Sequence, residues 1–248
     1  MDRLSRLGRI IFLIGVAALG LQHLIIGNFG PGLESVPGWV VGRTLLAYLV
    51  GLTLLGGAGM VLLRIRTQAG ALAVAVTFSV LLAFLQWPLL LYHFTDPNVW
   101  TTVFETLALS GAAWMLVASI AAPGEKQVSP KIGRLAFGIA LPAFGVLHFM
   151  YLHFVSTLIP AWMPDRVFLA GFVGVCFIAA GAAIITGIRA RLAGALLGLM
   201  FAIFVATLHI PLVITHFHNG SQWTSLCVAV MMWGGGWMAS GADGRTGA

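Results

Sequence analysis

Charged residues are scarce in this sequence. Asp, Glu, Lys and Arg make up 8% of its 248 residues, whereas 60% of the residues are hydrophobic. In soluble domains about a quarter of the residues are charged. The composition therefore excludes a soluble globular domain and indicates an integral membrane protein.

Cysteine is also rare, and the usual redox and metal-binding motifs are missing. The two cysteines are Cys176 and Cys227, and the sequence contains neither CxxC nor HExxH. A disulfide relay like that of the vitamin K reductases needs a CxxC, so that chemistry is excluded. Two lone thiols in apolar surroundings are typically inert. No spacing in the chain is a metal-binding signature.

Carboxylates are few as well, and Glu105 is the one that falls inside a predicted membrane span. A carboxyl group in lipid is costly unless it is neutral or paired, so we expect Glu105 to be protonated or bonded to a neighbouring histidine. It is a candidate catalytic residue, in a proton relay or in contact with a quinone. The alternative is a hydrogen-bonded structural group.

What the sequence has in abundance is long apolar runs. Runs of about 20 residues recur along the chain, and a helix of that length crosses a hydrocarbon core about 30 Å thick. We predict an all-α, polytopic membrane protein with eight transmembrane helices. The predicted spans are 9–29, 38–62, 69–92, 98–120, 133–153, 165–187, 192–214 and 222–241.

The positive charges predict how these helices are oriented. Eleven of the thirteen lysines and arginines fall on one side of the predicted topology, and only Arg43 and Arg166 fall on the other. Because cationic loops stay in the cytoplasm, both termini are expected there, in a bacterial-type inner membrane. The net charge of +6 reflects this topology, and no nucleic-acid partner is expected.

The sequence also repeats itself. Gly8 and His23 recur as Gly133 and His148 at an offset of 125 residues, and many later positions recur at an offset of 123. The pairs at 123 include Pro37/Pro160, Trp39/Trp162, Arg43/Arg166, Gly51/Gly174, Pro88/Pro211, His93/His216, Trp100/Trp223, Gly111/Gly234 and Trp114/Trp237. We predict two four-helix repeats, 1–122 and 133–248, joined by a cytoplasmic linker at 123–132. An even number of helices makes the repeats parallel.

All seven histidines fall on the predicted outer side. They are His23, His93, His148, His153, His209, His216 and His218. The second repeat holds five of them, and Gln86 stands in the first repeat where His209 stands in the second. Any metal or haem site should therefore lie in the second repeat.

His148 and His209 are the main candidate site residues. An ionisable residue inside a membrane usually faces the bundle interior and marks a pathway or site. Pro211 lies close to His209 and removes a backbone donor, which frees carbonyl groups near residue 207. We expect catalytic roles for both histidines, and a cofactor-binding set completed by His23 and Gln86. The alternative is neutral hydrogen bonds that fix helix packing.

Metal binding by the histidines is an alternative hypothesis. Neutral imidazole is a ligand of Zn, Cu and Fe, and two facing histidines can hold haem. The candidate ligands are His148, His209, His216 and His218. For His216 and His218 the alternative is an ordinary solvated outer loop.

Four motifs in the second repeat resemble a known family. GVLHF (145–149), IPAWMP (159–164), IRARLAG (188–194) and ATLHIP (206–211) together resemble the DoxX-like membrane proteins. The likeness covers residues 133–240 and, more weakly, 8–120, so the chain looks like a tandem DoxX-like protein.

The resemblance implies four-helix units and a redox context. Some relatives are associated with electron transfer from thiosulfate to quinone, and others with oxidative-stress complexes. His148, His209 and His23 match the polar positions of the family pattern. The acidic residue that many relatives carry midway along the second helix is missing, because Leu54 and Phe177 stand there.

Three functional hypotheses follow. The first is a membrane-embedded, redox-associated protein whose outer pocket, lined by His148, His209, His23, Gln86 and Glu105, binds a quinone or a similar lipophilic molecule. If it is an enzyme, it is a quinone-linked membrane oxidoreductase. The second is a haem or copper protein that uses the histidine cluster. The third is a non-catalytic membrane module that binds a lipid or a partner protein.

Overall fold

The computed structural model describes residues 3–34, 36, 40–120 and 129–241, and these ranges contain helices and no strands. The elements are α1 (Arg3–Ile26), α2 (Arg43–Leu62), α3 (Thr67–Leu81), the π-helix η1 (Leu82–Gln86), α4 (Trp87–Tyr92), α5 (Pro97–Ile120), α6 (Pro130–Met150), α7 (Leu152–Leu158), α8 (Arg166–Thr186), α9 (Ala190–Phe204), the π-helix η2 (Val205–His209), α10 (Ile210–Thr215) and α11 (Gly220–Ser240). The prediction of an all-α protein is confirmed for the described residues.

Seven helical spans in this part of the chain are long and apolar enough to cross a membrane, as expected of a multi-pass membrane protein. They are Arg3–Ile26, Arg43–Leu62, Thr67–Tyr92, Pro97–Ile120, Pro130–Met150, Arg166–Thr186 and Ala190–Thr215. The eighth predicted span corresponds to α11, which is less apolar because it is rich in glycine, serine and tryptophan. Much of α11 is buried among the other helices.

Three of the predicted spans extend several residues past the helices of the structure. The first, expected to run to residue 29, ends at Ile26. The span expected from residue 38 begins only at Arg43, and residues 40–42 form an irregular segment and a turn. The span expected to run to residue 153 ends at Met150, where α6 gives way to the separate short helix α7. The predicted linker at 123–132 falls mainly outside the described residues, and α6 already begins at Pro130.

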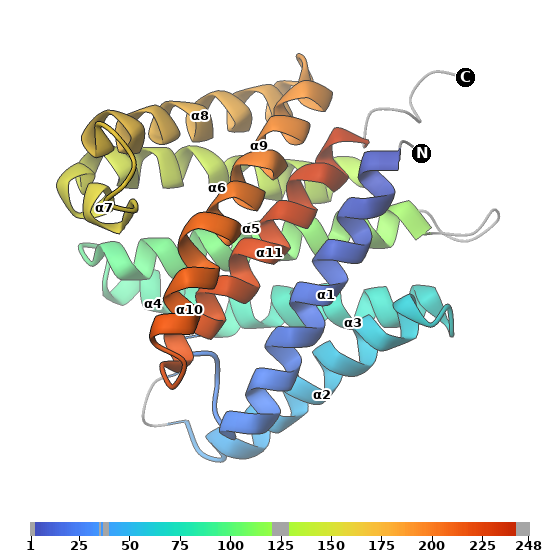
Figure 1. Cartoon of the computed structure of the whole chain (residues 1–248). Helices are drawn as coiled ribbons and strands as arrows, with labels where there is room; N and C mark the ends of the chain where they lie inside the picture. Colours follow the sequence, from blue (N-terminus) through green and yellow to red (C-terminus); the bar gives the residue numbers. More distant parts are fainter. Residues whose placement is uncertain (1–2, 35, 37–39, 121–128, 242–248) are drawn as a thin grey trace.

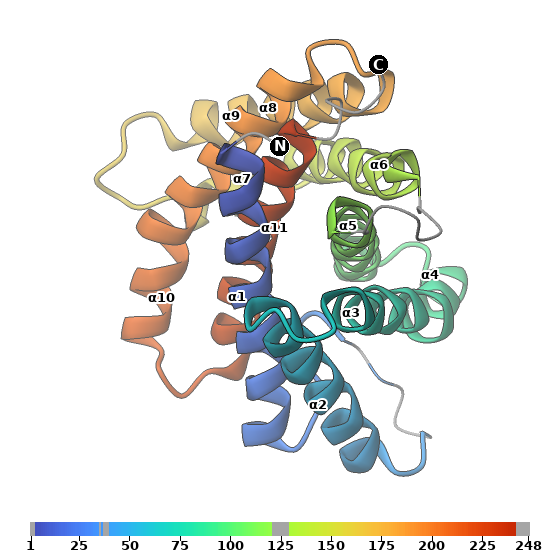
Figure 2. The same ribbon diagram turned by 90° about the vertical axis from the view of Figure 1, so that its right-hand side faces the viewer.

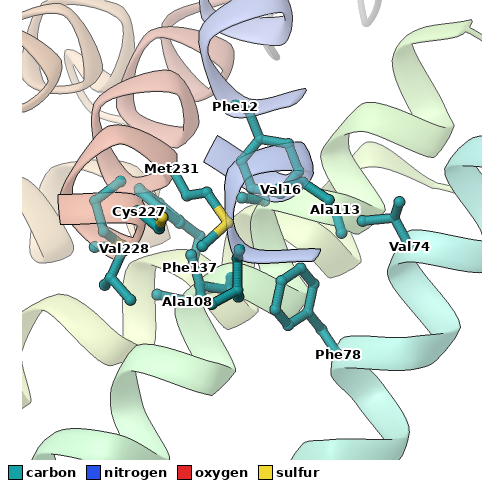
Figure 3. Packing of buried hydrophobic residues seen from close by; sticks show 14 of the residues in the cluster. Phe12, Val16, Val74, Phe78, Ala108, Ala113, Phe137, Cys227, Val228 and Met231 are labelled. Carbon is teal, nitrogen blue, oxygen red and sulfur yellow. The ribbon is translucent and has the colours of Figure 1, made fainter. Parts of the chain in front are cut away.

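Helices α1, α5, α6 and α11 form the centre of the bundle. Helix α1 lies beside α11, and α5 lies beside α6 (Figure 1). Around this centre, α2 to α4 lie at the lower right of Figure 2, α8 and α9 at the top, and α10 at the left. Phe12, Phe137 and Met231 are fully buried where the central helices meet (Figure 3). In lipid, close van der Waals packing of this kind stabilises helix association.

The central helices approach each other closely at glycines. A Cβ atom added at Gly8 would lie 2.7 Å from the Gly234 carbonyl oxygen, and one added at Gly111 would lie 2.7 Å from the Gly133 carbonyl oxygen. Both distances are too short for a real Cβ contact, and backbone atoms cannot move aside as a flexible side chain can. Small residues are therefore needed at both the α1–α11 and the α5–α6 crossings.

All seven histidines lie toward one end of the bundle, called here the histidine end. There α1, α4, α6 and α10 end, and α2, α5, α8 and α11 begin. Helix α1 begins and α11 ends at the opposite end (Figure 1). The two π-helices also lie near the histidine end, directly before Pro88 and Pro211, and they provide the local rearrangement expected where a proline removes a helix donor.

Candidate functional site

At the histidine end, His23 of α1 forms a buried pair with Glu34. The two ring nitrogens of His23 have different partners: Nδ1 lies 2.7 Å from the Leu19 carbonyl oxygen, and Nε2 lies 2.5 Å from Glu34 Oε2. Glu34 Oε2 also accepts a hydrogen bond from the Gly30 N–H at 2.9 Å. The exposed fractions of the two side chains are 0% for His23 and 1% for Glu34. Sequence reasoning did not identify Glu34.

Hydrogen-bond roles show that this pair holds one shared proton. A carbonyl oxygen only accepts, so His23 Nδ1 must carry a proton and donate it to Leu19. The contact between His23 Nε2 and Glu34 Oε2 then needs a second proton, on either the nitrogen or the oxygen. In either form the pair has no net charge, which makes its burial tolerable.

The chain segment that contains Glu34 folds into the bundle. This segment is residues 27–34 together with Val36, called here the 27–36 loop. Gly27 and Gly32 have φ angles of 62° and 88°, which glycine adopts readily, and they allow the chain to turn back. The side chains of Phe29, Leu33 and Val36 are buried in the main hydrophobic core. The loop is therefore part of the core and not a solvated connection.

Gln86 holds the same loop from the other side. Its Nε2 atom donates to the Leu33 carbonyl oxygen at 2.8 Å, and the side chain is fully buried at the end of η1. Gln22 lies beside His23 on α1 and ties it to α11, with Nε2 donating to the Gly220 carbonyl oxygen and to Thr224 Oγ1. Three side-chain oxygens in this region, Oε1 of Gln22, Glu34 and Gln86, are buried and have no hydrogen-bond partner among the described residues.

His148 occupies the corresponding place on α6, with a different environment. Its Nδ1 atom lies 2.8 Å from the Phe144 carbonyl oxygen, four residues earlier, as His23 Nδ1 lies from Leu19. Its Nε2 atom has no hydrogen-bond partner in the described ranges. The half-buried ring packs against Phe177 of α8, with 5.2 Å between ring centroids. One ring nitrogen of His148 is therefore available to a ligand.

His209 is the last residue of η2, and its Nδ1 atom is buried without a hydrogen-bond partner among the residues described. A series of phenylalanine rings leads from α6 through α8 to α9, the helix that continues into η2. Phe144, Phe177, Phe201 and Phe204 follow one another with centroid separations of 5.6 to 5.7 Å. No hydrogen bond or ring contact joins His148 to His209 in the described structure.

Residues 151–165, which follow α6, do not fold back as the 27–36 loop does. Helix α7 lies against α8, and most side chains from His153 to Phe168 are exposed or half-buried. In Figure 2 the yellow segment between α7 and α8 projects away from the bundle. The one carboxylate in this stretch, Asp165, caps α8 by accepting from the Phe168 N–H. No carboxylate therefore reaches His148 from this segment.

The other predicted site residues lie apart from this arrangement. Glu105 is half-buried on α5 and has no hydrogen-bond or ion-pair partner within the described structure, so no histidine is bonded to it. His216 and His218 are exposed, and the His216 ring lies 2.9 Å from Thr215 Oγ1. Among the described residues there is no group of three or more His, Cys, Asp or Glu side chains that could hold a metal ion. The structure thus does not bring the four predicted metal ligands together.

One signal in the sequence could have pointed to Glu34. The segment GNFGPGLESV contains a single carboxylate between the apolar residues Leu33 and Val36, and its glycines permit tight turns. A loop this apolar is expected to return to the core, which would place its one charge in a buried position. Gln22 and Thr224 had no comparable signal, because their pairing joins helices far apart in the sequence.

Comparison with protein-family models, with curated proteins and with solved structures finds no match for this chain.

Proposed function

We propose that this chain is a tandem DoxX-like membrane protein of eight transmembrane helices, and that its second repeat binds a quinone or a similar lipophilic carbonyl compound at the histidine end. The site consists of His148, His209 and the neighbouring phenylalanine rings. Both termini lie in the cytoplasm, and the histidine end faces outward.

Matched contacts in the two halves support the duplication. The Gly8–Gly234 and Gly111–Gly133 approaches involve equivalent positions, with the partner helices exchanged between the halves. Both π-helices end at equivalent residues, Gln86 and His209. Contacts that recur at a fixed offset are expected when two copies of one unit pack around an axis along the membrane normal. In this arrangement α11 is the fourth helix of the second repeat and the eighth span.

The unpartnered His209 Nδ1 atom is the observation that supports the site most directly. A buried polar atom without a partner costs free energy of about 1–3 kcal/mol, so such an atom calls for a ligand or water. A quinone carbonyl oxygen accepts hydrogen bonds, and the quinone ring can pack on Phe177 and its neighbours. His148 and His209 would orient the ring through its oxygens.

The proposed chemistry is proton exchange at a bound quinone. Reduction of a quinone to a quinol takes up two electrons and two protons. Imidazole exchanges protons near neutral pH, so His148 and His209 are suited to deliver the protons to the quinone oxygens or to take them back. The electrons would come from a partner redox protein, which is why we describe the chain as redox-associated.

Binding of decylubiquinone to the detergent-purified protein tests this function. We expect saturable binding that is weakened at least tenfold in His209→Ala and in His148→Ala. The matched control is His93→Ala, which removes an exposed histidine of the first half and should leave binding unchanged. Absence of saturable binding to the wild-type protein, or equal binding by all three variants, would contradict the proposal.

A further inference from the structure

The two ligand-facing positions of the second half have counterparts in the first half that are already occupied. His148 corresponds to His23, and His209 corresponds to Gln86. In the first half, Nε2 of His23 is hydrogen-bonded to the Glu34 carboxyl group. The amide nitrogen of Gln86 donates a hydrogen bond to the Leu33 carbonyl oxygen. Consecutive residues of one loop thus supply both partners.

What the loop supplies has a definite chemistry. It presents two oxygen atoms, one from a carboxyl group and one from a carbonyl group, and the apolar Leu33 side chain of the same segment is 1% exposed. The oxygen at His23 shares a proton with the imidazole, as a quinol hydroxyl group would. An apolar body that carries two hydrogen-bonding oxygens is also the description of a quinone.

We infer that the first half contains a second copy of the lipophile-binding site, and that the 27–36 loop occupies this copy as an intramolecular ligand. The inference rests on the proposed function for the ligand class. It assigns Glu34 and Leu33 the place that a quinone takes in the second half. The chain therefore has two sites of the same design, and the site in the second half is the one that is open to a ligand.

The loop leaves some of the polar groups around it without hydrogen-bond partners. Glu34 Oε1 and Gln86 Oε1 are both buried and have no partner in the described structure. A segment that existed only to complete the core would be expected to leave fewer buried acceptors unpaired. In the second half, the segment after α6 is exposed and has no carboxylate near His148. The difference between the loops, and not between the helices, determines which site is open.

Counting bound decylubiquinone tests the inference. We expect one equivalent in the wild-type protein and two in Glu34→Ala, with the count returning to one in the double variant Glu34→Ala/His23→Ala. Glu34→Gln is the matched control: its side chain keeps the shape of glutamate, and its amide can donate to His23 Nε2 in exchange for the bond from the Gly30 N–H, so the count should stay at one. A folded Glu34→Ala protein that binds one equivalent would overturn the inference.

The same experiment separates this inference from the proposed function. If the wild-type protein binds one equivalent that His209→Ala loses, while Glu34→Ala gains none, the function stands and the occupied second copy does not. If the wild-type protein binds none, the proposed function fails, whatever the first half does.

Histidine modification of the wild-type protein gives a second readout that needs neither a variant nor a ligand. Diethylpyrocarbonate reacts with accessible imidazole nitrogens, and peptide mass spectrometry locates the adducts. With the loop in place, His148 should react at least tenfold faster than His23. Equal rates at the two residues would show that Glu34 does not shield His23, and would overturn the inference even if Glu34→Ala failed to fold.

Discussion

His23 and His148, which the proposed duplication makes counterparts in the two halves of the molecule, have different surroundings. Each uses Nδ1 to bond the carbonyl oxygen four residues earlier, and each packs its Cβ close to a glycine of the next long helix, Gly51 or Gly174. Their Nε2 atoms have different partners, because that of His23 bonds to Glu34 and that of His148 has no partner among the described residues, and the His23 ring is the more deeply buried. In the proposed arrangement, one loop therefore determines whether the histidine of a half is open or closed to a ligand.

The largest effect is expected where the halves are most alike. Gly111→Ala would place a Cβ 2.5 Å from the Phe137 backbone nitrogen, and Gly234→Ala would place one 2.5 Å from the Gly8 carbonyl oxygen. Each should lower the free energy of unfolding by about 3 kcal/mol, because backbone at a helix crossing cannot yield without moving the helix. Thermal unfolding in detergent measures this.

Gly56→Ala is the control for this pair, since a Cβ there meets nothing within 4 Å. It should leave the unfolding temperature unchanged. If Gly111→Ala and Gly234→Ala differed strongly from each other, the two crossings would not be equivalent, and the duplication would lose its structural support.

The next largest effect should be a difference in stability between the equivalent histidine variants of the two halves. His23→Ala removes the partner of a buried carboxyl group and should destabilise the protein by about 2 kcal/mol, because Glu34 loses its hydrogen bond with the ring. His148→Ala removes a half-buried ring that makes one hydrogen bond and should cost under about 1 kcal/mol. Equal losses of unfolding free energy would show that the two histidines are held alike.

Exchanging His209 and Gln86, the polar residues at the ends of the two π-helices, tests the same difference between the halves. His209→Gln should weaken decylubiquinone binding about tenfold, equivalent to about 1.4 kcal/mol, since the more flexible amide side chain must be ordered before it can hold a quinone oxygen. Gln86→His should create no new binding, because the 27–36 loop still covers that position. Titration of each variant with decylubiquinone gives the result, and new binding in Gln86→His would argue against an occupied first half.

The smallest effect should again be symmetric. Trp100 donates its indole N–H to the Phe94 carbonyl oxygen at 2.7 Å, and Trp223 donates to Phe217 at 2.9 Å. Replacing either by phenylalanine removes one exposed hydrogen bond and should cost no more than about 1 kcal/mol. Thermal unfolding of both variants should give shifts of the same size, and a large shift in only one would mark a difference between the halves outside the loops.

Hydropathy and proline placement predicted most of the helical layout. Long apolar runs located the spans, and Pro211 indicated the disturbed backbone near residue 207 that the structure shows as the π-helix Val205–His209. The helix expected from residue 38 was wrong because hydropathy does not detect a turn such as 40–42. Hydropathy and proline positions are informative about features that depend on residues within one helix.

The site was harder to predict, because it depends on contacts between distant segments. His148 and His209 could be selected as polar residues inside apolar helices, whereas the pairing of Glu34 with His23 depends on a loop that returns to the core. Glu105, the carboxylate that hydropathy singled out, has no partner in the described structure, while the one in the loop has two. Position inside a predicted membrane span was thus a poor guide to which carboxylate is paired in the core.

Photolabelling with an azido-substituted quinone tests the central claim most directly, because it reports where the ligand lies. The account predicts labelled peptides from the end of α6 and from the η2–α10 region around His148 and His209, and none from the end of α1 or the 27–36 loop. Labelling at His23 and Glu34 in the wild-type protein, in place of the second half, would contradict it.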